Sequence, residues 1–243
     1  FGTSITCDGQ TLAVGAPRDM TNALTGGCVY VYAIEEGGTI VGEQRLDPRY
    51  SYQEQFFGFS VAVDGDRIAV GAFADSHIQP YAGAVYIYER DADSMWQQVD
   101  VIAPDELAGF DFFGTAVALH DDTLIATSNN RSVGNYANVG RAYVFQKIGD
   151  DWMQTQTIDP PLISNNVYWG ASICWEDDLL VIGANGMVDD GVRTGAASVL
   201  RQETNEVFAF QQTLVADGLG VGAAFGIATD IEDGRIIVGA PDL

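Results

Sequence analysis

Apolar and polar positions alternate along most of this chain with a period of two residues, the pattern of β-strands with two different faces. In residues 57–73, a first strand-like run at 61–63 is followed by the polar turn Asp64-Gly65-Asp66 and by an apolar run at 68–72. Two such runs around a short Asp/Gly turn predict a β-hairpin. The 3.6-residue period of an amphipathic helix does not appear, so the pattern predicts an all-β fold.

The predicted hairpin recurs five times at a constant spacing of 56 residues. Each copy opens on an aromatic residue followed by glycine, at Phe1-Gly2, Phe57-Gly58, Phe113-Gly114, Trp169-Gly170 and Phe225-Gly226. A fixed period of this length is typical of repeat architectures. We therefore expect one repeat domain with four full repeats, 1–56, 57–112, 113–168 and 169–224, and a partial repeat, 225–243.

Each full repeat contains more than the hairpin, whose strands we name A and B. After a polar loop of about ten residues, a glycine leads a third alternating run, strand C, at 27–32, 83–88, 140–145 and 195–200. A charged turn then precedes a fourth run, strand D, predicted at 96–102, 152–158 and 207–215. Four strands in about 56 residues predict a β-propeller of four-stranded antiparallel blades.

The recurring aromatic and glycine positions have a structural explanation. A ring at the first position is large enough to fill the wedge between two blades. We expect the glycine after it, and the Gly-Ala pair that ends strand B, where the backbone approaches a neighbouring sheet or takes a positive φ. The motif therefore indicates architecture and not catalysis.

Two runs, 57–72 and 225–241, resemble FG-GAP repeats, which occur in integrin α heads, in a glycosylphosphatidylinositol-specific phospholipase and in many bacterial and algal surface proteins. The resemblance implies a seven-bladed propeller, of which this chain would be a portion, and extracellular recognition or adhesion. With strands A and B alone in its last copy, the chain is not expected to close a ring. Either further repeats of a longer chain or another chain, including copies of this one, would supply the missing strands.

Members of this family often carry a calcium cage of the DxDxDG type between strands A and B. Here that loop holds only two or three acidic or polar residues on a tight turn, as in Asp8-Gly9-Gln10 or Asp64-Gly65-Asp66. Calcium takes six to eight oxygen ligands, so we do not carry the calcium sites over and expect neither a metal nor another cofactor.

Charge and composition restrict the classes of partner that the chain is expected to bind. The chain has 34 Asp and Glu against 11 Lys and Arg, a formal charge of -23, which disfavours nucleic acid and anionic membrane surfaces. No apolar run approaches the ~18 residues needed to span a bilayer. Cys7, Cys28 and Cys174 have no metal-ligand spacing, and we expect buried free thiols. Asn130-Arg131-Ser132 is a glycosylation acceptor sequence, which supports an extracellular or cell-surface location.

The long loops between strands B and C and between strands D and A fall on one side of the predicted blades. They cover 18–26, 74–82, 129–139 and 185–194, and 48–56, 105–112 and 161–168. Long, varied loops on a rigid scaffold usually carry binding. The candidate ligand-binding residues for a protein or a glycan are Tyr50, Tyr52, His77, Tyr81, Phe110, Arg131, Tyr136, Tyr168 and Arg193.

Catalysis has little support in the sequence. The two histidines, His77 and His120, belong to no hydrolase motif, and we name no catalytic residue. A glycan or lipid hydrolase using loop carboxylates is the most distant alternative. The first interpretation is a recognition or adhesion module; the second is a structural subunit of a surface fibre, sheath or filament.

Overall fold

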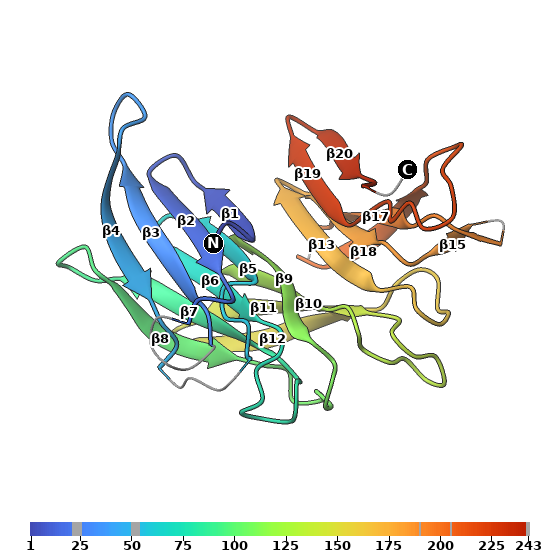
Figure 1. The fold of residues 1–243 in the computed structure, drawn as a ribbon, viewed down its shortest axis with the longest axis horizontal. Coiled ribbons are helices and arrows are strands. Elements are labelled where there is room, and N and C mark those ends of the chain that lie inside the picture. The colour runs from blue at the N-terminus through green and yellow to red at the C-terminus, as the bar shows by residue number, and fades with distance from the viewer. Residues whose placement is uncertain (21–25, 50–53, 190, 205, 242–243) are drawn as a thin grey trace. The chain divides into compact units, whose positions relative to one another are not determined.

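The computed structural model describes residues 1–20, 26–49, 54–189, 191–204 and 206–241, and all regular structure in these residues is β-strand (Figure 1). The first sheet contains β1 (Ser4–Cys7), β2 (Thr11–Ala16), β3 (Cys28–Ile34) and β4 (Ile40–Leu46). The second contains β5 (Ser60–Asp64), β6 (Arg67–Ala72), β7 (Ala84–Arg90) and β8 (Trp96–Ile102). These are strands A to D of two repeats, in chain order and antiparallel.

The pattern continues through the following repeats. The third sheet contains β9 (Phe113–His120), β10 (Thr123–Ser128), β11 (Arg141–Ile148) and β12 (Asp151–Ile158). The fourth contains β13 (Trp169–Glu176), β14 (Leu179–Ala184), β17 (Ala196–Gln202) and β18 (Phe208–Leu214), and β19 (Ala228–Glu232) pairs with β20 (Arg235–Gly239). The all-β fold of four-stranded antiparallel blades is confirmed.

The chain divides into two compact units, and residues of the third sheet fall in both. The first unit comprises Phe1–Ala126 and Val144–Thr155, and the second comprises Thr127–Tyr143 and Gln156–Leu243. Within the first unit, strand A of each repeat packs on the hairpin of the preceding one, β5 on β1 and β2 and β9 on β5 and β6. Within the second unit, β19 packs on β13 and β14 in the same way.

The ring that opens the second repeat lies between two blades, as expected, whereas Phe1, which opens the first, is 78% exposed. Phe57 is fully buried in a core cluster that includes Val29 and Leu46 of the first repeat and Val70 and Tyr86 of the second. Burial of a large side chain of this kind contributes about 1.5–3 kcal/mol. The wedge between neighbouring blades is therefore part of the hydrophobic core.

The two motif glycines act in different ways. Gly58 has a φ of 86°, and a Cβ atom there would lie 2.6 Å from the carbonyl oxygen of Cys28. Gly71 has an ordinary φ, but a Cβ atom there would overlap the carbonyl oxygen of Gly114 in the next repeat. One glycine is required by conformation and space, and the other by close approach alone.

A side-chain hydroxyl joins each described repeat to the next. Ser4, Ser60 and Ser172 on strand A donate to the carbonyl oxygens of Gly58, Gly114 and Gly226, at 2.9, 2.8 and 2.9 Å. In the third repeat, alanine stands at the serine position (Ala116) and threonine replaces the strand-B glycine (Thr127). Thr127 Oγ1 donates to the carbonyl oxygen of Gly170 at 2.8 Å, so strand B supplies the hydroxyl there.

Some local expectations were wrong. Only Cys28 is buried among the three free cysteines; Cys7 is exposed and Cys174 is half-buried. Residues 185–194, expected as a loop, contain a small hairpin of β15 (Val188–Asp189) and β16 (Val192–Arg193). The C strands also run about two residues beyond the predicted apolar runs, because pairing continues through polar residues such as Glu89.

Candidate functional site

The B–C and D–A loops of a repeat lie at the same end of its sheet and are tied by backbone hydrogen bonds. We call residues 74–82 and 105–112 loop pair two, and residues 129–139 and 161–168 loop pair three. In loop pair two, the amides of Phe110 and Phe112 donate to the carbonyl oxygens of Pro80 and Tyr81, at 2.9 and 3.4 Å. In loop pair three, the amides of Asn166 and Tyr168 donate to Ala137 and Asn138, at 2.8 and 3.0 Å.

The fourth repeat keeps part of this frame. The amide of Gly222 donates to the carbonyl oxygen of Arg193 at 2.7 Å, and the amide of Phe225 donates to Thr194 at 2.8 Å. The loops are therefore held alike in the second and third repeats and in a related way in the fourth, while the residues that they present differ.

Loop pair two presents a pair of stacked aromatic rings. The ring centroids of Tyr81 and Phe110 are 5.2 Å apart with an interplanar angle of 18°. The two residues remain 36% and 56% exposed, and their φ angles are 54° and 68°. Exposed bulky residues in the left-handed region are uncommon, which makes this pair the most distinctive feature of the loop end.

Loop pair two also contains a buried carboxylate, Asp75. Asp75 Oδ1 is 2.6 Å from His77 Nδ1, and Tyr86 donates its hydroxyl to Asp75 Oδ2 at 2.6 Å. Burial alone would raise the pKa of Asp75, but hydrogen bonds from His77 and Tyr86 hold this pKa below its usual value. The hydrogen bond to Asp75 raises the pKa of His77. His77 is thus anchored to the loop base, a role that the sequence alone did not indicate.

Loop pair three presents polar groups at the equivalent positions. Asn138 Nδ2 donates to Asn166 Oδ1 at 2.8 Å, where loop pair two has its two rings. The guanidinium of Arg193 lies 5.5 Å from the centroid of the Tyr168 ring and donates to the carbonyl oxygen of Asn166 at 3.3 Å. Tyr136, 46% exposed, closes a tight turn by paired backbone hydrogen bonds with Val133.

The structure sorts the predicted binding residues into two groups. Tyr81 and Phe110 stack in loop pair two, which also contains His77, bound to Asp75, whereas Tyr168 and Arg193 meet each other. Tyr136 lies elsewhere in loop pair three. Arg131 is half-buried, and its carbonyl oxygen accepts the amides of Val139 and Gly140, so its backbone closes the loop. Asn130 lies half-buried on the turn after β10, and its glycosylation stays a prediction. Tyr50 and Tyr52 lie outside the described residues.

A half-buried phenylalanine cluster in the first unit was not predicted. Phe73 contacts Phe56, Phe59 and Phe112 at centroid distances of 5.0, 4.6 and 5.3 Å, and Arg18 lies over Phe56 at 5.8 Å. The signal was present in the sequence, because Phe56 and Phe112 each directly precede a repeat-opening Phe-Gly pair.

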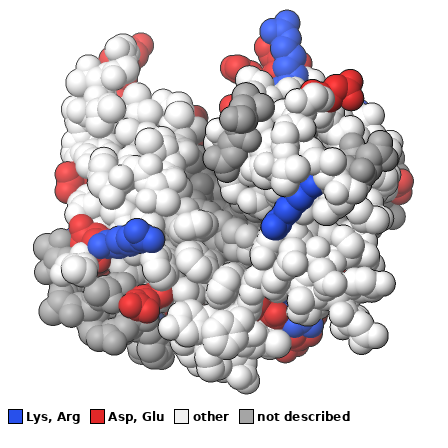
Figure 2. Space-filling model, turned by 45° about the vertical axis from the view of Figure 1, so that its right-hand side comes forward, with Lys and Arg blue, Asp and Glu red and all other residues white. Residues whose placement is uncertain are grey.

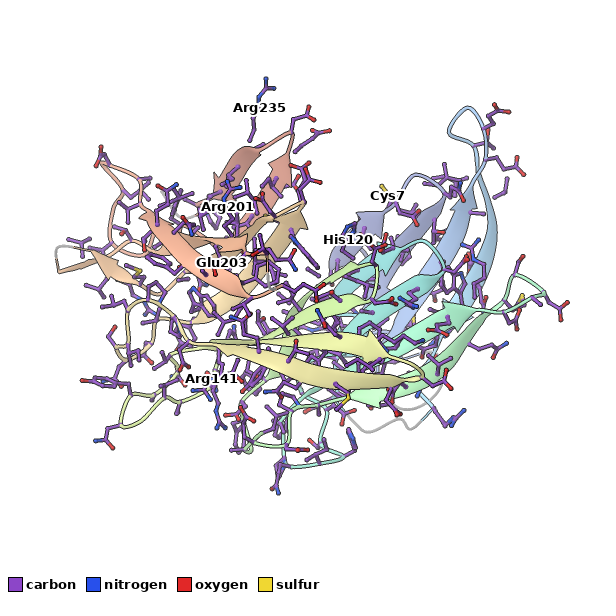
Figure 3. All side chains as sticks on the ribbon, turned by 180° about the vertical axis from the view of Figure 1, so that it is seen from behind. Cys7, His120, Arg141, Arg201, Glu203 and Arg235 are labelled. Carbon is purple, nitrogen blue, oxygen red and sulfur yellow. The ribbon has the colours of Figure 1, made fainter. Side chains whose placement is uncertain are left out.

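The opposite end of the sheets is polar, and some of its charges form ion pairs. In the first unit, a cavity of about 360 Å³ near the A–B turns is lined by Asp64, Gly65, Asp66, Arg67, Glu89, Arg90, Asp121 and Lys147. Arg67 pairs with Glu89 at 3.1 Å, and Lys147 also pairs with Glu89. His120, labelled with Cys7 in Figure 3, lies 3.8 Å from Asp64. Three cations, Arg67, Arg90 and Lys147, thus face four carboxylates in this cavity.

The described residues contain no group of three or more His, Cys, Asp or Glu side chains placed to hold a metal ion. The acidic and basic side chains in view in Figure 2 are scattered among uncharged ones and do not form a single charged patch. In the part of the chain that the structure describes, we also find no helix long and apolar enough to cross a membrane.

Fold and repeat together define a protein of repeated four-stranded β-blades that belongs to the propeller-forming class. A model of the FG-GAP repeat matches residues 41–88 and 96–145. The FG-GAP resemblance is thereby confirmed for these two segments. Each matched segment begins on a D strand, β4 or β8, and ends on the C strand of the following repeat. No curated protein matches the chain.

Proposed function

We propose that this chain is an extracellular recognition or adhesion module that binds a protein or a glycan through its B–C and D–A loops. FG-GAP repeats usually occur in extracellular domains and are typically non-enzymatic. The same proposal holds that the chain has no calcium site, no catalytic function and no nucleic-acid partner. The chain's formal charge of -23 supports the last of these.

One observation carries the proposal. The second and third repeats share one backbone frame in their loop pairs, and the fourth keeps part of it, but the side chains change from the Tyr81–Phe110 stack to the Asn138–Asn166 amide pair and then to Arg193 and Gly222. A constant scaffold with varied exposed side chains is the usual arrangement of a binding surface. At the other end, the A–B turns are short, and the turn residue Asp122 is paired with Arg67.

The test is a binding screen on arrays of glycans and extracellular proteins. Wild type is compared with a loop variant, Tyr136→Ala combined with Arg193→Ala, and with an A–B turn variant, His120→Ala combined with Asp66→Ala. We expect at least one ligand whose signal falls in the loop variant and persists in the turn variant. A ligand lost only in the turn variant would contradict the proposal.

The structural alternative has its own readout. A subunit of a fibre or sheath would form large homopolymers, and light scattering on the native protein would reveal them. A monodisperse protein that retains ligand binding is the result that we expect. Homopolymers that bury the loop residues would replace the recognition function by a structural one.

A further inference from the structure

The first, third and fourth repeats have a glutamine at the same position of strand D, at Gln44, Gln156 and Gln212. The side-chain amide of Gln44 donates to the carbonyl oxygen of Trp96, the first residue of β8, at 2.8 Å. Its side-chain oxygen accepts the backbone amide of Trp96, also at 2.8 Å. Gln156 binds the backbone of Phe208, the first residue of β18, in the same way, at 2.8 and 2.9 Å. We call this pair of hydrogen bonds to the next repeat the glutamine bridge.

The glutamine bridge accompanies a buried aromatic ring. Trp96 and Phe208, which receive the bridge, are 5% and 3% exposed. The second repeat has Asp100 at the glutamine position, and its carboxylate accepts the amide of the neighbouring Val101 at 2.7 Å instead. The aromatic residue that follows in the third repeat, Trp152, is only half-buried. The bridge therefore marks a place where an aromatic residue packs against the preceding repeat.

The fourth repeat has the glutamine and a cavity beside it. Gln212 lies opposite Val199 in the pairing of β17 and β18, as Gln44 lies opposite Val31 in the first repeat. The side chain of Gln212 is exposed and has no hydrogen-bond partner among the described residues. The cavity, of about 410 Å³, is lined by Leu179, Val199, Arg201, Gln211, Gln212, Gly234 and Ile236. Its size suits an organic group such as an aromatic side chain.

The apolar wall of this cavity corresponds to a closed interface in the first unit. Val199 and Ile236 occupy the same repeat positions as Val31 and Ile68. In the first unit, Val31, Ile68 and Trp96 belong to one core cluster. Ile68 is fully buried there, whereas Ile236 is half-buried. The chain thus shows what covers such a wall elsewhere, namely the aromatic residue that opens a D strand.

The edge of β20 that faces away from β19 offers a second contact. In the part of the chain that the structure describes, β20 pairs only with β19. Arg235, labelled in Figure 3, projects from this hairpin, is exposed and has no ion-pair partner among the described residues. Its equivalent Arg67 lies directly opposite Glu89 on strand C and pairs with it at 3.1 Å. A carboxylate opposite Arg235 would therefore stabilise a strand added to β20.

We propose that the free edge of β20 and the cavity beside Gln212 form a docking site for a β-hairpin. The occupant is the C–D hairpin of a further FG-GAP repeat, with a glutamate opposite Arg235 and a tryptophan or phenylalanine as the first residue of strand D. Its first strand extends the sheet of β19 and β20. Gln212 binds the backbone of the aromatic residue, whose ring fills the cavity. The site continues the repeat interfaces of the same chain and is independent of the loop surface proposed above.

Two segments of the chain provide matched probes. Residues 83–102 contain Glu89 and Trp96 and meet both requirements. Residues 195–214 contain Phe208 but have Arg201 at the position of Glu89, so they would place a cation opposite Arg235. Synthetic peptides with these two sequences are titrated against the 243-residue chain by isothermal titration calorimetry. We expect saturable one-to-one binding of the 83–102 peptide, and roughly tenfold weaker binding of the 195–214 peptide.

Substitutions in the peptide and in the protein locate the contacts. Trp96→Ala in the 83–102 peptide should weaken binding roughly tenfold, and Gln212→Ala in the protein about fivefold. Arg235→Glu should weaken binding of the same peptide, whereas a Glu89→Arg peptide should bind this variant better than it binds wild type. Such a charge swap cannot arise from misfolding. Arg49→Glu, which reverses an exposed arginine of the first unit, is the control and should leave binding unchanged.

Three results would overturn the docking site. The first is no saturable binding of the 83–102 peptide to wild type. The second is equal binding of the peptides with and without Trp96, or a failed charge swap in a variant that circular dichroism shows to be folded. The third is a homodimer, detected by light scattering, that is disrupted by Arg235→Glu and excludes the peptide, because β20 would then dock a second copy of the chain.

Discussion

The hydroxyl of Thr127 offers a sharp test of how the repeats are joined. Thr127 is fully buried, and its hydroxyl donates to the carbonyl oxygen of Gly170 at 2.8 Å. Thr127→Val keeps the shape of the side chain and removes the donor, so no cavity forms. The hydrogen bond itself contributes about 0.5–1.5 kcal/mol, and a buried carbonyl left without this donor raises the cost toward ~3 kcal/mol. We therefore expect Thr127→Val to lower the free energy of unfolding by about 0.5–3 kcal/mol.

Ser60→Ala provides a graded comparison. Ser60 makes the equivalent bond to Gly114 at 2.8 Å but is only half-buried, so water can replace part of the lost interaction. Ser60→Ala should therefore lower the free energy of unfolding by a smaller amount, about 0.5–1.5 kcal/mol. The order of the two variants therefore follows burial, although the two bonds have the same length.

The assay is urea unfolding followed by tryptophan fluorescence, since Trp169 is buried directly beside Gly170. Thr213→Val, at a half-buried threonine on β18, controls for replacing a strand threonine by valine. If the urea midpoint falls while the dependence of the free energy of unfolding on urea concentration stays the same, then stability alone has changed. Thr127→Val within ~0.3 kcal/mol of the control would refute the idea that this hydroxyl joins two repeats.

Three further predictions concern backbone, pH and salt. Gly58→Ala should destabilise the fold severely, because the new Cβ atom would lie 2.6 Å from the carbonyl oxygen of Cys28. Gly65→Ala, which has open space around it, should cost only about 1 kcal/mol. Thermal unfolding followed by circular dichroism compares the two variants. The pKa of His77 is raised in the folded state, so the stability that His77 contributes is complete below its unfolded pKa of about 6.5 and is lost as pH rises through the higher folded pKa. The pKa of Asp75 is lowered, so the stability that Asp75 contributes is lost only in acid. His77→Gln should therefore flatten the stability profile above about pH 6.5, and an unchanged slope there would contradict the ion pair. Because the net charge is -23, the melting temperature should rise between about 0.02 and 0.5 M NaCl; a fall would mean that screened ion pairs outweigh self-repulsion.

The strands were predictable because the buried and exposed faces of each strand appear as a short alternation of apolar and polar residues in the local sequence. Strand D of the second repeat was predicted at 96–102 and is β8 (Trp96–Ile102), since its ends are set by a buried tryptophan and a buried isoleucine. The polar ends of the C strands were missed because Glu89 pairs through backbone bonds that do not depend on side-chain polarity. The β-bulges between strands C and D, as at Ile87/Tyr88, leave no signal in the alternation.

The candidate site was less predictable for a different reason. Loop length and aromatic content pointed to Tyr81 and Phe110, but their stacking depends on the hydrogen bond between Phe110 and Pro80, which joins segments about thirty residues apart. Asp75 was not singled out, because nothing in the local sequence shows that it is buried beneath His77 and Tyr86. Contacts between distant loops come from the repeat frame, not from either loop alone.

Hydrogen–deuterium exchange with and without the strongest ligand from the array tests the central claim most directly. The account predicts that ligand slows exchange in the B–C and D–A loop segments, foremost at 74–82 and 105–112, and leaves the A–B turns near Gly65 unchanged. Slowed exchange at the A–B turns or along the D strands, with the loops unaffected, would contradict a recognition surface built from the loop pairs.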